Sequence, residues 1–185
     1  MTHEIICAGF GGQGILFLGK ILAFAGLEEK KEVSWIPSYG PEMRGGTCNC
    51  SVVVSDDKRV GMPVVVTPNI VVAMNRLSME KFESTMVKDG FLIYNTTLIE
   101  IKPQRNDIKT AHVAASQISN ELGNVKLANM VMLGALLKFV PIIKKSTVEQ
   151  IIRKQLTGSK AKFFEPNMKA IDAGEKAVVI VSRAS

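Results

Sequence analysis

The residues of this chain best placed to do chemistry form a glycine-rich segment, Ile6-Cys7-Ala8-Gly9-Phe10-Gly11-Gly12-Gln13-Gly14-Ile15. An apolar run that breaks into glycines and resumes as a long apolar segment is typical of a strand, a tight turn and a buried helix. Such a turn presents backbone N–H groups at a helix N-terminus, where the helix dipole favours phosphate, carboxylate or another electron-rich group. This segment is therefore expected to position a ligand or a neighbouring chain, and the Gln13 amide can both donate and accept.

Two nucleotide-binding motifs match this segment in their letters but not in their chemistry. Residues 9–14 satisfy G-x-G-x-x-G, yet a dinucleotide site also has an acidic residue roughly 20 residues on, and the expected strand at residues 33–38 has none. Residues 14–20 spell G-x-x-x-x-G-K, but Ile21 stands where a P-loop has a Ser or Thr hydroxyl for magnesium. A further alternative is that the glycines only let a strand and a helix pack closely.

A second glycine-rich segment follows the next expected strand and reads Ser38-Tyr39-Gly40-Pro41-Glu42-Met43-Arg44-Gly45-Gly46-Thr47. In an open α/β sheet, loops that follow parallel strands share one edge, and ligands bind in the crevice there. Arg44 offers a planar fork of donors for a carboxylate or phosphate, and Glu42 can hold Arg44 or accept from an amine or hydroxyl. The alternative is a surface ion pair of little energetic worth.

The elements that must position these loops alternate along the first two thirds of the chain. Strands are expected at residues 3–8, 32–37, 49–55, 70–74, 90–95, 108–112 and 178–181. Helices are expected at residues 78–87, 113–122, 127–139 and 161–173, with another opened by the capping box Ser146-x-x-Glu149. The pattern predicts an α/β fold with a doubly wound, mainly parallel, Rossmann-like sheet and a helical C-terminal part. Without a linker or repeat, residues 1–185 are expected to form one domain.

Composition narrows the classes of function. The 185 residues are 46% hydrophobic, and 23 basic against 17 acidic residues give a net charge of +6. This charge serves solubility or attracts nucleotides, acidic cofactors or an acidic electron-transfer protein. No basic run is interleaved with aromatic residues, so nucleic-acid binding is not expected.

No secretory leader is visible, and the most apolar window, residues 127–143, is interrupted by Asn129, Lys138 and Pro141. We therefore expect a cytoplasmic protein without a membrane span. We expect Asn129 to satisfy a buried backbone group rather than to touch a substrate.

The three cysteines cannot form a disulfide framework. Cys48-x-Cys50, with both histidines far away, lacks the ligands of a zinc site, and no closely spaced four-cysteine run is present. No metal site is expected on this chain, and each cysteine is expected to be a buried, reduced thiol.

At the two loops the chain resembles the gamma subunit of 2-oxoacid:ferredoxin oxidoreductases. The resemblance continues at Asn129-x-x-x-Leu133-Gly134-Ala135 and at Asn167-x-x-Ala170-x-x-x-Gly174, so it spans nearly the whole chain. The form Glu42-Met43-Arg44-Gly45-Gly46, with Cys50 after it, is most similar to the 2-oxoglutarate and branched-chain (2-oxoisovalerate) types, and less to the pyruvate type. Cys48 departs from the small residue of the family pattern.

This resemblance implies that a 2-oxo acid is decarboxylated on thiamine diphosphate, that electrons pass through iron–sulfur clusters to ferredoxin, and that the acyl group goes to coenzyme A. The chain has neither a G-D-G…Asn-Asn motif for magnesium diphosphate nor cluster cysteines, so alpha, beta and delta-type subunits must carry these groups. The gamma subunit would help to close the active site near thiamine diphosphate and coenzyme A, with no catalytic residue of its own. The residues carried over as cofactor-binding are Gly11, Gly12, Gln13, Gly14, Tyr39, Glu42, Arg44 and Gly45.

Two alternatives of other classes stay open. The first is a free-standing nucleotide-binding module, for which the glycine loop is the support. The second is a purely structural subunit with no residue near chemistry. Self-association of the isolated chain is a further expected contact, apart from these alternatives.

Overall fold

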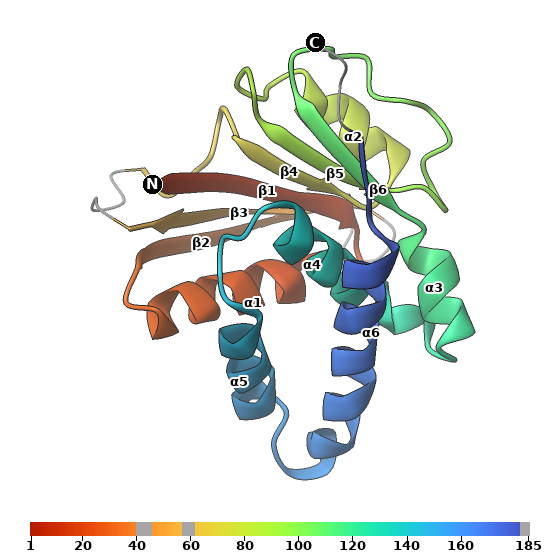
Figure 1. The fold of residues 1–185 in the computed structure, drawn as a ribbon. Coiled ribbons are helices and arrows are strands. Elements are labelled where there is room, and N and C mark those ends of the chain that lie inside the picture. Colours follow the sequence, from red (N-terminus) through yellow and green to blue (C-terminus); the bar gives the residue numbers. More distant parts are fainter. Residues whose placement is uncertain (40–45, 57–61, 182–185) are drawn as a thin grey trace.

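A computed structural model describes residues 1–39, 46–56 and 62–181 of the chain. These residues form a seven-stranded sheet of order β2-β3-β1-β4-β5-β6-β7 (Figure 1). The strands are β1 Thr2–Phe10, β2 Glu32–Tyr39, β3 Thr47–Ser55, β4 Ile70–Ala73, β5 Phe91–Asn95, β6 Lys109–Val113 and β7 Val179–Val181. The α-helices are α1 Ile15–Glu28, α2 Arg76–Glu83, α3 Ala115–Glu121, α4 Ala128–Phe139, α5 Lys145–Gln155 and α6 Phe164–Ala177, with short 3-10 turns at Val125–Leu127 and Gly158–Phe163.

The sheet is mixed but mostly of one direction. β1, β4, β5 and β6 are parallel neighbours, whereas β3 is antiparallel to both β1 and β2. Because β3 is antiparallel to both of its neighbours, β2 runs in the same direction as β1. Within the described sheet, only β3 and β7 run in the opposite direction. The predicted α/β class, the mainly parallel sheet and the helical C-terminal part are confirmed.

Alternation along the strands divides the core into two layers of unequal size. Ile5 and Cys7 of β1 belong to the larger core under α1 and α4, while Ile6 and Ala8 face the smaller core under α2. In Figure 1, α1, α4, α5 and α6 gather on one side of the sheet, and α2 lies on the other. The helical C-terminal part thus thickens one layer.

Helix α1 is apolar around most of its circumference because it lies between the sheet and other helices. Two glycines on it let β2 and β3 approach its backbone. A Cβ at Gly26 would lie 2.8 Å from Cγ2 of Val33, and a Cβ at Gly19 would meet the Cys50 sulfur. Gly19 and Gly26 therefore serve close packing of strand against helix. This is the alternative role considered above for the loop glycines.

Helices α4 and α6 cross at two glycines, which accounts for the C-terminal part of the resemblance. A Cβ at Gly134 would collide with the Ile171 carbonyl group of α6, and a Cβ at Gly174 would collide with the Val131 carbonyl group of α4. These motif residues bring the two backbones into contact.

The predicted capping box at the start of α5 is wrong. The helix begins at Lys145, and its N-cap is Lys144, which makes no side-chain cap. The Lys144 N–H instead donates to Oε1 of Glu29, 2.8 Å away, and the N-cap lies two residues before Ser146. Glu149 forms a helical ion pair with Arg153.

The apolar window at residues 127–143 contains α4, which is buried along most of its length, as expected for a core helix. Among the described residues, no helix combines the length and apolarity that a bilayer crossing requires.

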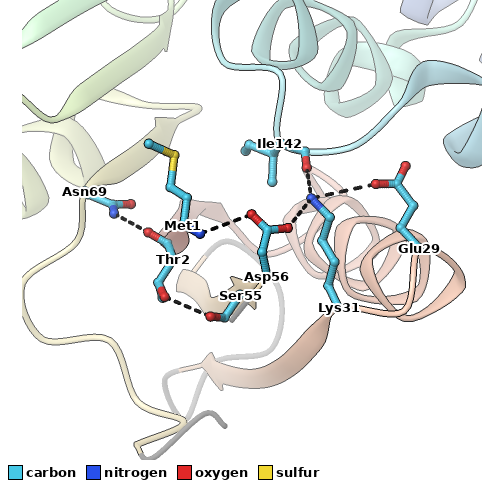
Figure 2. Close-up of polar contacts among 8 residues, drawn as sticks. All are labelled: Met1, Thr2, Glu29, Lys31, Ser55, Asp56, Asn69 and Ile142. Carbon is cyan, nitrogen blue, oxygen red and sulfur yellow. Dashed lines mark hydrogen bonds and ion pairs between the residues drawn. The ribbon is translucent and has the colours of Figure 1, made fainter. Parts of the chain in front are cut away.

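The edge of the sheet where β1 begins is closed by a network of charges and hydrogen bonds, here called the amino edge (Figure 2). Lys31 Nζ donates to the Ile142 carbonyl oxygen at 2.9 Å, and it lies 3.1 Å from Oδ1 of Asp56 and 3.7 Å from Oε2 of Glu29. The terminal amine of Met1 pairs with the same Asp56. This network joins β1, β3, α1 and the segment between α4 and α5.

Candidate functional site

The two glycine-rich loops meet at the opposite edge, here called the carboxyl edge because β1, β2, β4, β5 and β6 end there. The last residue of β1, Phe10, pairs with Thr47, the first residue of β3, and Tyr39 pairs with Cys48. The Gly11 N–H donates to the Gly46 carbonyl oxygen at 3.0 Å and so ties the first loop to the end of the second. The predicted shared edge is confirmed.

The first loop turns sharply because two of its glycines adopt left-handed conformations. Gly12 has φ +97° and is exposed with open space around it, whereas Gly14 has φ +75° and is the N-cap of α1. Residues with a Cβ rarely adopt such values, so this path requires glycine. The loop leaves the strand and enters the helix within four residues.

The Gln13 side chain folds back onto the loop. Its Oε1 accepts from the Phe10 N–H at 2.6 Å, and it lies 3.5 Å from Nδ2 of Asn75 in the neighbouring loop. Gly9 leaves the room for this, since a Cβ there would stand 2.6 Å from the same oxygen. Gln13 therefore uses its acceptor oxygen to hold the turn.

Among the described residues of this edge, the N-terminus of α1 is electropositive. Gly14 provides no side-chain cap, and the first turn of the helix contains no acidic residue. The N–H groups of the first turn have no partner within a helix, and the dipole adds positive potential there. Ile15, Leu16 and Phe17 follow the half-buried Gly14, so the donors that this turn can offer to an oxygen are backbone N–H groups.

Asn129 of α4 holds the start of α1 through a hydrogen bond to its backbone. Its Nδ2 donates to the Gly14 carbonyl oxygen at 3.1 Å, which confirms the expectation that it satisfies a buried backbone group. Its side chain fills the position that a Cβ at Gly14 would take. Asn129 is 5% exposed, and its Oδ1 has no hydrogen-bond partner in the part of the chain that the structure describes.

Two further asparagines of this edge escaped sequence reasoning. Asn75 follows β4, caps α2 by accepting from the Ser78 N–H at 2.9 Å, and reaches Gln13. Asn95 ends β5, is fully buried, and donates to Oγ of Ser116 at 2.8 Å. The sequence feature that could have identified them is an asparagine directly after a run of apolar residues. The glycine loop follows β1 in the same way.

The other predicted residues divide into two groups. Tyr39 is the last residue of β2, at the carboxyl edge. Glu42, Arg44 and Gly45 lie outside the described residues.

Hydrogen-bonding groups dominate the described part of the carboxyl edge. Asp56 and His3, whose pKa values are lowered, lie at the amino edge, whereas burial raises the pKa values of Tyr94 and Cys48 near the carboxyl edge. Within residues 1–39, 46–56 and 62–181, no group of three His, Cys, Asp or Glu side chains could hold a metal ion. The arrangement can orient a polar group.

The sheet order also departs from that of a dinucleotide site. In the Rossmann order, the strand beside the first is parallel to it and carries the acidic residue that binds the ribose. Here the strand beside β1 is the antiparallel β3, and β2 is one place further out. The ribose would therefore face Thr47 and Cys48, which offer no carboxylate.

The protein family described as "Pyruvate ferredoxin/flavodoxin oxidoreductase" matches residues 4–177 of the chain. The ketoisovalerate oxidoreductase subunit VorA of Methanothermobacter marburgensis is 38% identical over 168 residues, which cover 90% of this chain and 34% of VorA. The 2-oxoglutarate synthase subunit KorC of Methanocaldococcus jannaschii is 35% identical over 157 residues, or 82% of each chain.

Among solved structures, the keto/oxoacid ferredoxin oxidoreductase gamma subunit of Geobacter sulfurreducens superposes with a TM-score of 0.79 at 26% identity. The match covers 94% of this chain and 96% of that one. The chain thus has relatives of similar length, but it spans about a third of the VorA proteins that it also matches.

Proposed function

Because the chain belongs to the pyruvate ferredoxin/flavodoxin oxidoreductase family, we propose that it is the gamma subunit of a 2-oxoacid:ferredoxin oxidoreductase. The complex would decarboxylate a 2-oxo acid oxidatively, transfer the acyl group to coenzyme A and reduce ferredoxin. The observation that carries the proposal is the family match over residues 4–177, together with the glycine loop and the end of the second loop joined at one edge.

The role proposed for this chain is to complete the active site from the carboxyl edge. Gly11 to Gly14 would place the N–H groups of α1 against a polar group of coenzyme A or of a partner subunit. Tyr39, Glu42, Arg44 and Gly45 would act from the second loop, with Arg44 binding a phosphate or a carboxylate. Support comes from the Gly11–Gly46 hydrogen bond and from the uncapped helix.

The cofactors are proposed to be shared unequally among subunits. The cysteines are buried within the sheet, and among the described residues no three His, Cys, Asp or Glu side chains come together, which does not fit an iron–sulfur cluster, so partner subunits would carry the clusters. Thiamine diphosphate and magnesium are assigned to partners as well, because the chain has no G-D-G…Asn-Asn motif to hold a magnesium-bound diphosphate. The proposed partners are alpha, beta and delta-type subunits, with ferredoxin reached through the complex.

The proposed substrate is a branched-chain 2-oxo acid or 2-oxoglutarate. The names of VorA and KorC support this choice, as does the Glu42–Gly46 form of the second loop. An anaerobic assay of viologen reduction with 2-oxoisovalerate, 2-oxoglutarate and pyruvate, each with and without coenzyme A, distinguishes the three acids.

The decisive experiment is anaerobic affinity purification of the tagged chain from its native cells. We expect thiamine-binding and cluster-binding subunits to co-purify, together with activity that depends on the 2-oxo acid and coenzyme A. Recovery of the chain alone and without activity would overturn the proposal. A complex that keeps its specific activity after removal of this chain would favour a purely structural subunit.

The role of Arg44 is tested with Arg44→Ala in the assembled complex, with the exposed Arg153→Ala on α5 as the matched control. Loss of a charge-assisted contact to a ligand should raise the apparent KM for coenzyme A or for the 2-oxo acid about tenfold or more. Unchanged values for both substrates would exclude this role. Calorimetry of the isolated chain with NADH, NADPH and ATP tests the nucleotide-binding alternative, for which no heat is expected.

A further inference from the structure

Two of the buried thiols face each other across neighbouring strands. Cys7, Cys48 and Cys50 are all free and buried, as the sequence predicted. Cys7 of β1 and Cys50 of β3 are register partners, and both side chains are 0% exposed. Cys48 is paired with Gly9 and so has no thiol opposite it.

The backbone hydrogen bonds show which kind of antiparallel pair the two cysteines form. Odd-numbered residues of β1 direct their backbone groups to the β3 side, because Met1 accepts from Asp56 and Gly11 donates to Gly46. Cys7 is odd-numbered, so it forms a hydrogen-bonded pair with Cys50, a class with a Cα separation of about 5.5 Å. This separation is common among disulfides, which close most often at about 5.5–6 Å.

The two thiols influence each other's titration. The nearby Cys7 thiol lowers the pKa of Cys50, whereas the nearby Cys50 thiol and burial raise the pKa of Cys7. The indole of Trp35 and the Cys50 sulfur both border Gly19. A Cβ at Gly19 would collide with the Cys50 sulfur and would lie 3.1 Å from Nε1 of Trp35. Within the described residues this indole N–H has no hydrogen-bond partner. The directions of the two pKa shifts make Cys50 the more acidic thiol of the pair.

We propose that Cys7 and Cys50 form a redox-active pair that a peroxide closes into a reversible disulfide. The Cys50 thiolate attacks one oxygen of hydrogen peroxide, the O–O bond breaks, and the departing hydroxide leaves as water after taking a proton. The sulfur of Cys7, on losing its proton, then attacks the Cys50 sulfenic acid, the S–O bond breaks, and a second water leaves. Two thiols and one peroxide give one disulfide and two waters, with one electron withdrawn from each sulfur.

Oxidation would change a contact at the carboxyl edge, where α1 begins. The Cys50 thiol donates to the carbonyl oxygen of Ile15, the first residue of α1, at 3.7 Å, and a disulfide has no proton for this bond. The Cβ atoms of a hydrogen-bonded pair must also approach by about 1 Å to reach disulfide geometry, which makes the bond easy to reduce. The pair thus couples an oxidant to the start of the glycine loop's helix, whatever complex the chain serves.

The experiment uses the reduced, folded chain and hydrogen peroxide, which is hardly larger than water. After exposure, the sample is quenched in acid, unfolded in alkylating reagent and digested for mass spectrometry. We expect two thiols to disappear together, a cross-link between the peptides of Cys7 and Cys50, an alkylated Cys48, and recovery of all three thiols with dithiothreitol. Oxidation of Met62, which is 67% exposed, reports that the dose was sufficient.

A Cys48→Ser variant simplifies the assignment, because Cys48 and Cys50 share a tryptic peptide; it should form the same cross-link. Cys7→Ser should instead leave Cys50 with stable single-sulfur oxidation products. All three thiols intact while Met62 is oxidised would overturn the proposal, and so would a disulfide that contains Cys48. Circular dichroism before quenching verifies that the oxidised chain was still folded.

Discussion

The two edges of the sheet are stabilised by different chemistry. At the amino edge, Lys31 is only 17% exposed and its ammonium group has three oxygen partners, with Asp56 shared by the terminal amine (Figure 2). At the carboxyl edge, the contacts come from neutral amides, chiefly Gln13 and Asn129, around glycine backbone. At the amino edge the charged groups pair with one another, whereas at the carboxyl edge the described residues give the N-terminus of α1 no side-chain cap.

This difference separates stability from binding. Opposite charges that satisfy one another are unavailable to a ligand, so the amino edge serves to join elements of the chain. Neutral amides can hold a loop in shape without cancelling the positive potential of the helix beside it. The two edges should therefore respond differently to substitution.

The largest effect is expected from Gly14→Ala. A left-handed alanine costs about 1–2 kcal/mol, and its Cβ would collide with the Asn129 amide, for a total of about 3 kcal/mol in the free energy of unfolding. Urea denaturation measures it. Gly12→Ala is the matched control, because that glycine also has positive φ but open space around it, and it should lose only the backbone part. Equal losses at both positions would show that Asn129 does not crowd Gly14.

Lys31→Met should destabilise the chain by about 2 kcal/mol, because the Ile142 carbonyl oxygen and two carboxylates lose their shared donor. Assembly with partner subunits should be unchanged, since this edge lies away from the glycine loop. Lys154→Met, which breaks only an exposed pair with Glu28, should stay within about 0.5 kcal/mol of wild type. A Lys31 variant that folds normally but assembles poorly would contradict the division between the edges.

Asn129→Ala should cost about 1 kcal/mol in stability, because the Gly14 carbonyl oxygen loses a buried donor. Asn129→Asp should cost more than Ala, since a carboxylate cannot donate to that oxygen and would be buried beside it. Chemical denaturation of both variants gives the order. In the double variant Gly14→Ala/Asn129→Ala the collision is relieved. Its loss in the free energy of unfolding should therefore be smaller than the sum of the losses of the two single variants.

The smallest effect is a dependence of stability on pH at the amino edge. Burial, and next the nearby Lys31 charge, lower the pKa of His3 below its ordinary 6.5. Below pH 6.5, His3 of the unfolded chain therefore takes up a proton more readily than His3 of the folded chain. The free energy of unfolding falls as the pH drops from 6.5 to the pKa of His3 in the folded chain. The melting temperature should fall less for His3→Gln than for wild type over that window. Parallel curves would exclude His3.

Asp56 acts in the same direction at lower pH. Its pKa is lowered first by the hydrogen bond from Lys31, so its contribution is present above its ordinary pKa and is lost as pH falls through the folded value. In Lys31→Met this acid-induced loss should shrink. A variant as acid-sensitive as wild type would place the titrating group elsewhere.

Much of the fold was readable because hydrophobic periodicity is local. The strands, the core helix at α4 and the buried thiols followed from runs of apolar residues and their interruptions. The capping box failed because α5 begins two residues earlier, after Lys144, whose backbone N–H donates to the sequence-distant Glu29. The asparagines at the ends of β4 and β5 were missed because a lone asparagine after a strand gives no sign of which loop it will meet.

The sequence by itself determined the family, the two glycine loops, their order after successive parallel strands, and the expectation that Asn129 serves the backbone. Glycine and charge spacing carry such information because left-handed turns and exposed helix termini demand particular residues nearby in the chain. The tertiary structure alone decided that β3 separates β2 from β1, that Cys7 opposes Cys50, and that Gln13 closes on its own loop. These depend on strand register and side-chain packing between segments remote in sequence, which no local pattern encodes.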